Sequence, residues 1–326
     1  MTHILFRQPL ALRYQQLLIK DFPNIRFTFF EDIEDQKVTD DLWSDVEVLF
    51  GAEFLVSELA KAPMLRWIHS PQCNLDRICL DEVFATGNVV VTCPQEQNVR
   101  QIGEYVMATV FAFSKQLFSF KDIGRDDPHQ MWKGDLRDKT WILGDKTFLQ
   151  VGLDNIGTEV TRCAHCLGMK VQGVHHRRSF HPHCETVVAE TDLHSILPNA
   201  DVVCISLPCS KRYYHWFGED EFKLMKDDSI LVVVHCGRVV DMKALEKAAV
   251  AGKFRGVIMD AYEKKAPPKS SPLWNLSSVL LTPQLSGYPH VSPDGPFQSF
   301  CHNIHCYLTE AYDDLKDIVD EKVYSS

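Results

Sequence analysis

The stretch TFLQVGLDNIG, residues 147–157, decides how this chain folds. Its first part, Thr147–Val151, is a short apolar run typical of a buried strand. The loop Gly152–Gly157 follows at once and leads into a helical pattern, expected over Ile156–Leu167. Glycines at the first and last loop positions allow a tight turn and close packing of the helix on the strand. The stretch therefore predicts a strand–turn–helix unit of a parallel α/β sheet.

Asp154 stands where the G-x-G-x-x-G pattern of dinucleotide-binding loops has its second glycine. There a side chain fills space meant for pyrophosphate and brings negative charge towards a negative ligand. Beside a helix N-terminus, its carboxylate can accept hydrogen bonds from free N–H groups, as an N-cap does. We expect this to weaken or abolish cofactor binding, at a cost on the order of a few kcal/mol. The other candidate contacts in the loop are Gly152, Asn155, Ile156 and Gly157.

Outside this unit, apolar runs alternate with helical patterns along the whole chain, which indicates parallel α/β structure. The expected strands are 3–6, 25–30, 47–50, 65–69, 88–92, 147–151, 169–174, 201–206, 229–234, 256–259 and 278–281. The expected helices include a long one over 97–117 and others over 156–167, 242–251 and 296–308. Gly168 and Gly252 fall at helix ends. We expect two Rossmann-like, doubly wound domains with a cleft between them.

Composition narrows the class of protein. The chain has 326 residues, of which 45% are hydrophobic and 24% charged, as in soluble globular proteins. A formal net charge of −10 argues against nucleic acid or an anionic membrane as a partner. Without a membrane-length apolar run or a secretory signal, we expect a cytoplasmic protein. The 11 cysteines are then expected to be reduced thiols, with no disulfides.

Four basic residues, His175, His176, Arg177 and Arg178, follow the strand expected at 169–174. A site that prefers NAD usually places an acidic residue near this point to hold the ribose hydroxyls. Arg177 and Arg178 instead suit a 2′-phosphate, so a retained cofactor would be NADP rather than NAD. The alternative is a solvated basic turn.

Several motifs in a shared order resemble the D-isomer specific 2-hydroxyacid dehydrogenases, the family that includes glyoxylate/hydroxypyruvate reductases. They are APMLRWIHSP (62–71), VVVTCP (89–94), GEYVMATVFAF (103–113), VGLDNIG (151–157), CISLPCS (204–210), LMKDDSILVVVHCGRVVD (224–241), FRGVIMDAYEKKAPP (254–268), SPLWNLSSVLLTPQLSGYPH (271–290) and VDEKVY (319–324). The resemblance implies a substrate-type, flavodoxin-like domain over 1–96 plus 290–326. It also implies a dinucleotide-binding domain over 97–289, with a helix and arm that pair two chains as a homodimer.

The resemblance also implies a catalytic Arg, Glu and His, and this chain departs at all three positions. The Arg, which would bind the substrate carboxylate, is replaced by Cys236. The Glu is replaced by Lys265, and the proton-exchanging His by Gln284, whose amide cannot exchange a proton near neutral pH. The substrate loop also differs and reads Gln72-Cys73-Asn74-Leu75-Asp76.

Two of the cofactor positions that the resemblance implies are kept, at Pro208 and Asp260. Asp260 would lie on the nicotinamide carboxamide side of the cofactor, or would simply cap a turn at a strand end. Cys236 could be a nucleophile beside His235 or Lys265; the preferred interpretation is a small residue that fills the space left by the Arg.

The cysteines and histidines around CAHC (163–166) and CHNIHC (301–306) could suggest a metal site. We expect none, because these residues fall on helix faces. The sequence thus favours a family member that has lost hydride transfer and binds a small acid, NADP or NAD, or a partner protein in its cleft. The alternatives are re-purposed chemistry at Cys236, Lys265 and Gln284, and a weak NAD(P)-dependent 2-keto acid reductase.

Overall fold

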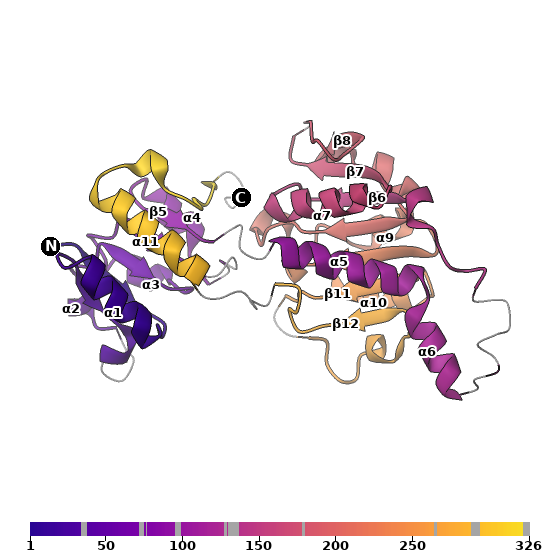
Figure 1. Ribbon diagram of the computed structural model, residues 1–326, viewed down its shortest axis with the longest axis horizontal. Helices are drawn as coiled ribbons and strands as arrows, with labels where there is room; N and C mark the ends of the chain where they lie inside the picture. The colour runs from indigo at the N-terminus through magenta and orange to yellow at the C-terminus, as the bar shows by residue number, and fades with distance from the viewer. Residues whose placement is uncertain are drawn as a thin grey trace. The chain divides into compact units, whose positions relative to one another are not determined.

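The protein is described here by a computed structural model, which covers residues 1–33, 38–71, 75, 77–94, 99–126, 129, 137–177, 180–263, 266–287 and 294–321. Two compact units are present. The first comprises residues 1–97, 210–212 and 289–326, and the second comprises 98–209 and 213–288. Each contains one parallel sheet between helices (Figure 1), as the alternating sequence pattern predicts.

The first unit has a five-stranded sheet in the order β2-β1-β3-β4-β5, which is the flavodoxin-like order. Its strands are β1 (His3–Phe6), β2 (Arg26–Thr28), β3 (Val48–Phe50), β4 (Trp67–His69) and β5 (Val90–Thr92). Its helices are α1 (Leu12–Asp21), α2 (Asp40–Trp43), α3 (Val56–Leu59), α4 (Leu80–Ala85) and α11 (Asp294–Leu308). Helices α1 and α11 cover one sheet face, where Leu18, Phe300 and Ile304 pack on β1, β3 and β4.

The second unit has a seven-stranded sheet in the order β12-β11-β10-β9-β6-β7-β8. Its strands are β6 (Thr147–Val151), β7 (Lys170–His175), β8 (Thr186–Ala189), β9 (Val202–Ile205), β10 (Ser229–Val233), β11 (Phe254–Met259) and β12 (Val279–Leu281). All neighbouring strands are parallel. The chain order reverses direction between β6 and β9, and this is the switch point at which such sheets bind ligands.

Helices cover both faces of this sheet because successive residues of each buried strand point to opposite sides. Leu231 and Val233 of β10 belong to one apolar cluster, and Ile230 and Val232 to the other. The helices are α5 (Val99–Ser114), α6 (Leu117–Asp126), α7 (Asn155–Cys166), α8 (Leu193–Ile196), α9 (Glu219–Leu224) and α10 (Met242–Val250). Figure 1 shows α5 and α7 side by side, and they share the second cluster.

Two of the differences from the expected elements lie in the second unit. The helix expected over 97–117 ends at Ser114, and Gln116, with φ of 57°, turns the chain into α6. Strand β8 was not predicted from the sequence. The expected helix ends at Gly168 and Gly252 are confirmed, because both glycines have left-handed backbones with φ of 77° and 75°.

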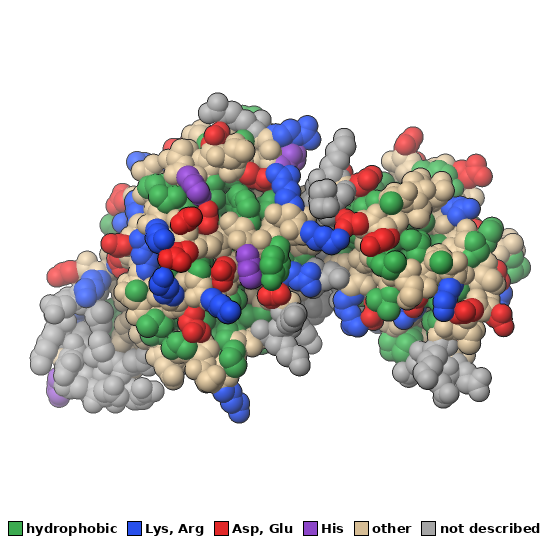
Figure 2. Space-filling view, turned by 180° about the vertical axis from the view of Figure 1, so that it is seen from behind, with side chains coloured by type: hydrophobic (Ala, Val, Ile, Leu, Met, Phe, Trp, Pro, Cys, Tyr) green, Lys and Arg blue, Asp and Glu red, His purple; other side chains and the backbone are tan. Residues whose placement is uncertain are grey.

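Charged side chains of both signs are mixed with apolar ones on the face shown in Figure 2. In the described part of the chain, no helix is long and apolar enough to cross a lipid bilayer.

Candidate functional site

The candidate site lies at the carboxyl edge of the seven-stranded sheet, around the switch point between β6 and β9. The parallel register pairs Val151 with Ile205, Ile205 with Val233, and Val233 with Met259. The loops that follow these strands therefore begin at the same edge. They contain the glycine loop, Pro208, Cys236 and Asp260, each named from the sequence as a candidate.

The glycine loop has the tight geometry that its two glycines predict. Gly152 has φ of 94°, in the region that favours glycine. A Cβ placed on Gly157 would lie 1.9 Å from the carbonyl oxygen of Gly152, so only glycine fits there. Ile156, also in this loop, is buried in the apolar cluster under α7. The first and last glycines thus let α7 start directly against β6.

Asp154 is the N-cap of α7, as the sequence predicts. Its carboxylate accepts a hydrogen bond of 3.0 Å from the backbone N–H of Gly157, and Asn155 is the first residue of the helix. An anion at a helix N-terminus is stabilised by the free N–H groups and the helix dipole. The protein's own carboxylate therefore takes an N–H group that a phosphate would otherwise use, and its residue remains exposed at the surface.

The basic turn after β7 is partly described. Arg177 and His176 are exposed, and Nε of Arg177 donates to Nε2 of His176 over 2.8 Å. Arg178 lies outside the described residues.

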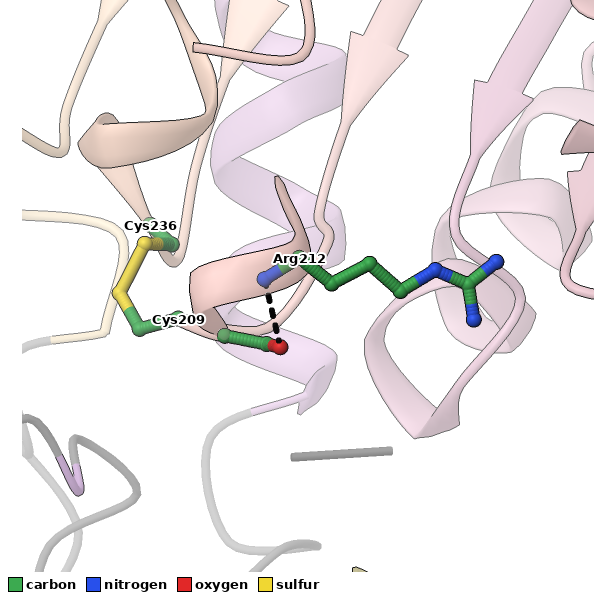
Figure 3. The surroundings of a disulfide bond; sticks show 4 residues. Cys209, Arg212 and Cys236 are labelled. Carbon is green, nitrogen blue, oxygen red and sulfur yellow. Dashed lines mark hydrogen bonds between the residues drawn. A yellow bond between two sulfur atoms is a disulfide. The ribbon is translucent and has the colours of Figure 1, made fainter. Parts of the chain in front are cut away.

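Cys236 forms a disulfide with Cys209 (Figure 3). The expectation of reduced thiols without disulfides was therefore wrong for this pair. The two Cα atoms lie 5.3 Å apart although the residues are 27 positions apart in sequence. The physical reason is the register: Cys209 follows Ile205 by four positions, and Cys236 follows its partner Val233 by three.

The residue after Cys236 is held tightly against the next loop. A Cβ on Gly237 would lie 2.3 Å from the Cα of Tyr262, so the backbones approach as closely as glycine allows. Cys236 itself is 1% exposed. The residue predicted to replace the family's Arg is thus a buried cysteine in a closely packed turn.

Asp260 caps the turn that carries Gln284. Its Oδ1 accepts from the Thr282 hydroxyl at 2.5 Å and from Leu285 N–H at 2.7 Å, and its Oδ2 accepts from Ser286 N–H at 2.9 Å. The Ser286 hydroxyl also donates to Oδ2. An ionised carboxylate has about four acceptor sites. These four donors use them all, which matches the turn-capping alternative considered from the sequence.

Gln284 is exposed and has a left-handed backbone with φ of 55°. Its N–H is placed 3.1 Å from the carbonyl oxygens of both Asp260 and Thr282. Asp260 and Gln284 therefore belong to one hydrogen-bonded turn. Lys265 lies outside the described residues, as do Gln72, Cys73, Asn74 and Asp76 of the substrate loop.

Two residues near the switch point extend the site beyond the sequence candidates. Gln150, fully buried in β6, donates from Nε2 to the Ser206 hydroxyl at 2.9 Å and to the Gly152 carbonyl at 3.0 Å. It joins the ends of β6 and β9. Pro208, two residues after Ser206, is buried. A glutamine inside the apolar run TFLQV was the signal that could have identified it.

Among the described residues, no group of three or more His, Cys, Asp or Glu side chains is arranged to hold a metal ion. His181 instead contacts the Thr158 hydroxyl at 3.2 Å and the Cys184 sulfur at 3.5 Å.

These features define a class of protein: a doubly wound parallel sheet with a glycine loop at its switch point, preceded by a flavodoxin-like unit. The family model described as "D-isomer specific 2-hydroxyacid dehydrogenase, NAD binding domain" matches residues 107–286, more than half of the chain. The chain therefore belongs to the D-isomer specific 2-hydroxyacid dehydrogenase family.

Two reductases are similar to this chain over most of its length. It is 28% identical to the glyoxylate reductase of Thermococcus kodakarensis over 269 residues, which cover 80% of this chain and 79% of that protein. It is 27% identical to glyoxylate/hydroxypyruvate reductase B of Pectobacterium carotovorum over 237 residues, covering 71% and 72%.

Solved structures share the fold over nearly the full length. A D-isomer specific 2-hydroxyacid dehydrogenase from Xanthobacter autotrophicus, in complex with NADPH and MES, has a TM-score of 0.82 at 18% identity, covering 98% of both chains. D-lactate dehydrogenase from Aquifex aeolicus, complexed with NAD and lactic acid, has a TM-score of 0.79 at 21% identity, covering 98% of this chain and 99% of that one.

Proposed function

We propose that this protein is an NAD(P)-dependent oxidoreductase of the 2-hydroxyacid dehydrogenase type, with weak or re-purposed chemistry on a small 2-keto acid. The observation that carries the proposal is the family's nucleotide-binding domain over residues 107–286. The glyoxylate and hydroxypyruvate reductases among its relatives suggest the substrate class. A bound nicotinamide would supply the hydride.

The chain's own residues fit the cofactor only in part. Gly152 and Gly157 form the close cradle that a pyrophosphate needs, and the exposed Arg177 suits a 2′-phosphate, so we propose NADP over NAD. Asp154 opposes the phosphate with its charge, and Asp260 has its acceptor sites filled by the 282–286 turn. We infer binding that is weaker than a full glycine loop would give.

Hydride transfer is expected to be slow because the side chains at positions 236 and 284 lack the groups that assist it. Cys236 offers no cationic fork for a carboxylate, and Gln284 offers no exchangeable proton. General acid–base help is worth about 10²–10⁴ in rate, so a reaction without it would be slow. Its rate would then depend on positioning within the site.

A second candidate is a binding or regulatory protein without hydride transfer. The observation that favours it is the buried Cys236 sulfur, bonded to Cys209 at the position of the family's Arg. Its ligand would be a small acid, the nucleotide itself, or a partner protein.

Nucleotide titration separates the two candidates and tests Asp154. NADPH and NADH are added to the purified protein, with nicotinamide fluorescence and thermal shift as readouts, and turnover of glyoxylate and hydroxypyruvate is then measured. We expect Asp154→Gly to tighten NADPH binding by about tenfold or more, equivalent to about 1.4 kcal/mol, because it removes both charge and bulk. Asp154→Asn keeps a helix cap without the charge and should give a smaller gain.

Slow turnover with bound NADPH supports the oxidoreductase. Binding without turnover supports the second candidate, and no binding by wild type or Asp154→Gly overturns the proposed function. Restoring Arg, Glu and His at 236, 265 and 284 should raise turnover only when all three are combined, because such groups act as a unit.

We also propose that two chains pair through α5 and the arm that leads to Trp141. Two large apolar residues in this region, Leu117 and Ile142, are 55% and 70% exposed. Light scattering on the purified protein would give a mass near twice 37.3 kDa. A monomer mass would contradict this assembly.

A further inference from the structure

The disulfide between Cys209 and Cys236 lies in the loops of the candidate site. Cys209 follows β9 and Cys236 follows β10, which are neighbouring strands of one sheet. Both cysteines belong to the second unit, so the bridge is internal to a single folded body. Their Cα separation of 5.3 Å is in the ordinary range for a disulfide.

In the described part of the chain, the free thiols include Cys79, Cys163, Cys166, Cys184, Cys204, Cys301 and Cys306. Burial raises the pKa of Cys79 and of Cys301 to about 11, and that of Cys184 to about 12. Because the thiolate is the reactive form, these three thiols are poor nucleophiles near neutral pH. Within the second unit, Cys209 and Cys236 are the described cysteines that the fold holds at bonding distance.

The two sulfur-bearing residues differ in accessibility. Cys236 is 1% exposed, whereas Cys209 is only partly buried and packs at the margin of the apolar cluster. Beyond Cys209 the chain enters a short turn in which the Arg212 N–H donates to the Ser210 hydroxyl at 3.3 Å (Figure 3). Cys209 is therefore the more accessible of the two residues to a small reagent.

We propose that Cys209 and Cys236 are a reversible dithiol–disulfide pair that exchanges with low-molecular-weight disulfides and thiols of the glutathione type. The Cys209 thiolate attacks one sulfur of the small disulfide, forming a mixed disulfide and releasing one small thiol. The Cys236 thiolate then attacks the Cys209 sulfur, closes the bridge and releases the second small thiol. The protein loses two electrons and two protons, and the small disulfide gains both.

The loops that carry Cys209 and Cys236 pack against the glycine loop and against the loop after β11. A Cβ on Gly152 would lie 3.3 Å from the backbone nitrogen of Leu207, so the segment after β9 packs directly against the first glycine. Cys209 is two residues further along that segment. On the other side, Cys236 precedes Gly237, which touches Tyr262. The bridge therefore fixes two loops of the site together, and reduction frees them.

The exchange is tested on the whole protein, purified without reductant. Free thiols are alkylated under native conditions and located by peptide mass spectrometry, with oxidised and reduced glutathione as the probes. We expect wild-type protein to protect only this pair as a disulfide, and to open and close it reversibly as the glutathione ratio changes. Bridged protein should also melt on the order of 5–10 °C higher than reduced protein.

Two variants test the order of the steps. Cys236→Ser should accumulate a glutathione adduct on Cys209, whereas Cys209→Ser should leave the buried Cys236 unmodified until the protein unfolds. The control Cys166→Ser removes an exposed, free thiol and should exchange as wild type does. Native wild-type protein with both thiols free in oxidised glutathione, or with a bridge that opens only on unfolding, would overturn the proposal.

A change in nucleotide affinity on reduction rests on the proposed function and is read separately, by NADPH titration of the oxidised and reduced forms. We expect a several-fold difference between them. Reversible exchange with no NADPH binding in either form would leave the redox pair established and remove the proposed function. NADPH binding with no thiol exchange would support the proposed function and overturn the redox pair.

Discussion

At the scale of single residues, Gly157 preserves the shape of the glycine loop, whereas Asp154 changes its charge. Gly157 is required by the backbone, because the carbonyl of Gly152 occupies the place of a side chain. Asp154 is not required by the backbone; it caps the N-terminus of α7 by accepting a hydrogen bond from the N–H of Gly157. The loop therefore keeps the shape of a dinucleotide site while one residue changes its charge.

The steric requirement at Gly157 gives a stability prediction. Gly157→Ala places a methyl group 1.9 Å from a backbone oxygen, so α7 must shift away from β6. Overpacking of this kind costs about 1–3 kcal/mol, and we expect a value at the upper end. Urea unfolding measures this loss in the free energy of unfolding. The control is Gly287→Ala, where a Cβ meets nothing within 4 Å; equal stability of the two variants would show that the close approach is not rigid.

At the scale of elements, the turn after β12 depends on a residue from the neighbouring strand end. Asp260 follows β11 and binds four donors in residues 282–286, including the backbone N–H groups of Leu285 and Ser286. The left-handed Gln284 lies between these donors in sequence. Asp260 therefore sets the conformation of the segment at which the family places its catalytic His.

Replacement of Asp260 by Asn should loosen this turn without changing the side-chain size. An amide nitrogen cannot accept a hydrogen bond, so the donors to one carboxylate oxygen lose their partner. This loss costs about 1–3 kcal/mol in the free energy of unfolding. Hydrogen exchange should speed up at the amides of Leu285 and Ser286. The exposed Asp192, changed to Asn, is the control in the same unit. Unchanged protection of both amides in Asp260→Asn would contradict the assigned role.

At the scale of the whole molecule, one buried histidine makes the stability of the first unit depend on pH. His69 is fully buried in β4, stacks on Phe50 and contacts the Thr92 hydroxyl through Nδ1 at 2.8 Å. Its Nε2 is buried without a hydrogen-bond partner among the described residues. Burial lowers the pKa of His69 from 6.5 to about 3.

Because the folded pKa is depressed, protonation favours the unfolded chain. The stabilisation is present above the unfolded pKa of 6.5 and is lost as the pH falls from there towards about 3. We expect His69 to contribute a slope of about 1 kcal/mol per pH unit in this window. Thermal unfolding from pH 7 to pH 4 should show a flatter profile for His69→Phe than for wild type. The exposed His305, changed to Phe, should keep the wild-type profile; a profile unchanged by His69→Phe would refute the assignment.

Much of the molecule follows from its sequence alone. Apolar alternation predicts the two parallel sheets, TFLQVGLDNIG predicts the turn into α7, and Asp154 predicts its cap. These features are encoded in residues that are adjacent or one helical turn apart, so local sterics and hydrogen bonding determine them. Membership of the family follows from several such motifs in a fixed order.

Only the tertiary structure decided which distant residues meet at the carboxyl edge of the second sheet. The disulfide joins residues 27 positions apart, Asp260 holds a turn 26 positions away at Ser286, and Gln150 bonds Ser206 across 56 positions. Strand order and register set these contacts, and composition and periodicity do not encode which strand lies beside which. The sequence showed a cysteine where the family resemblance implies an arginine, but it did not show that this cysteine is bonded to the cysteine after the neighbouring strand.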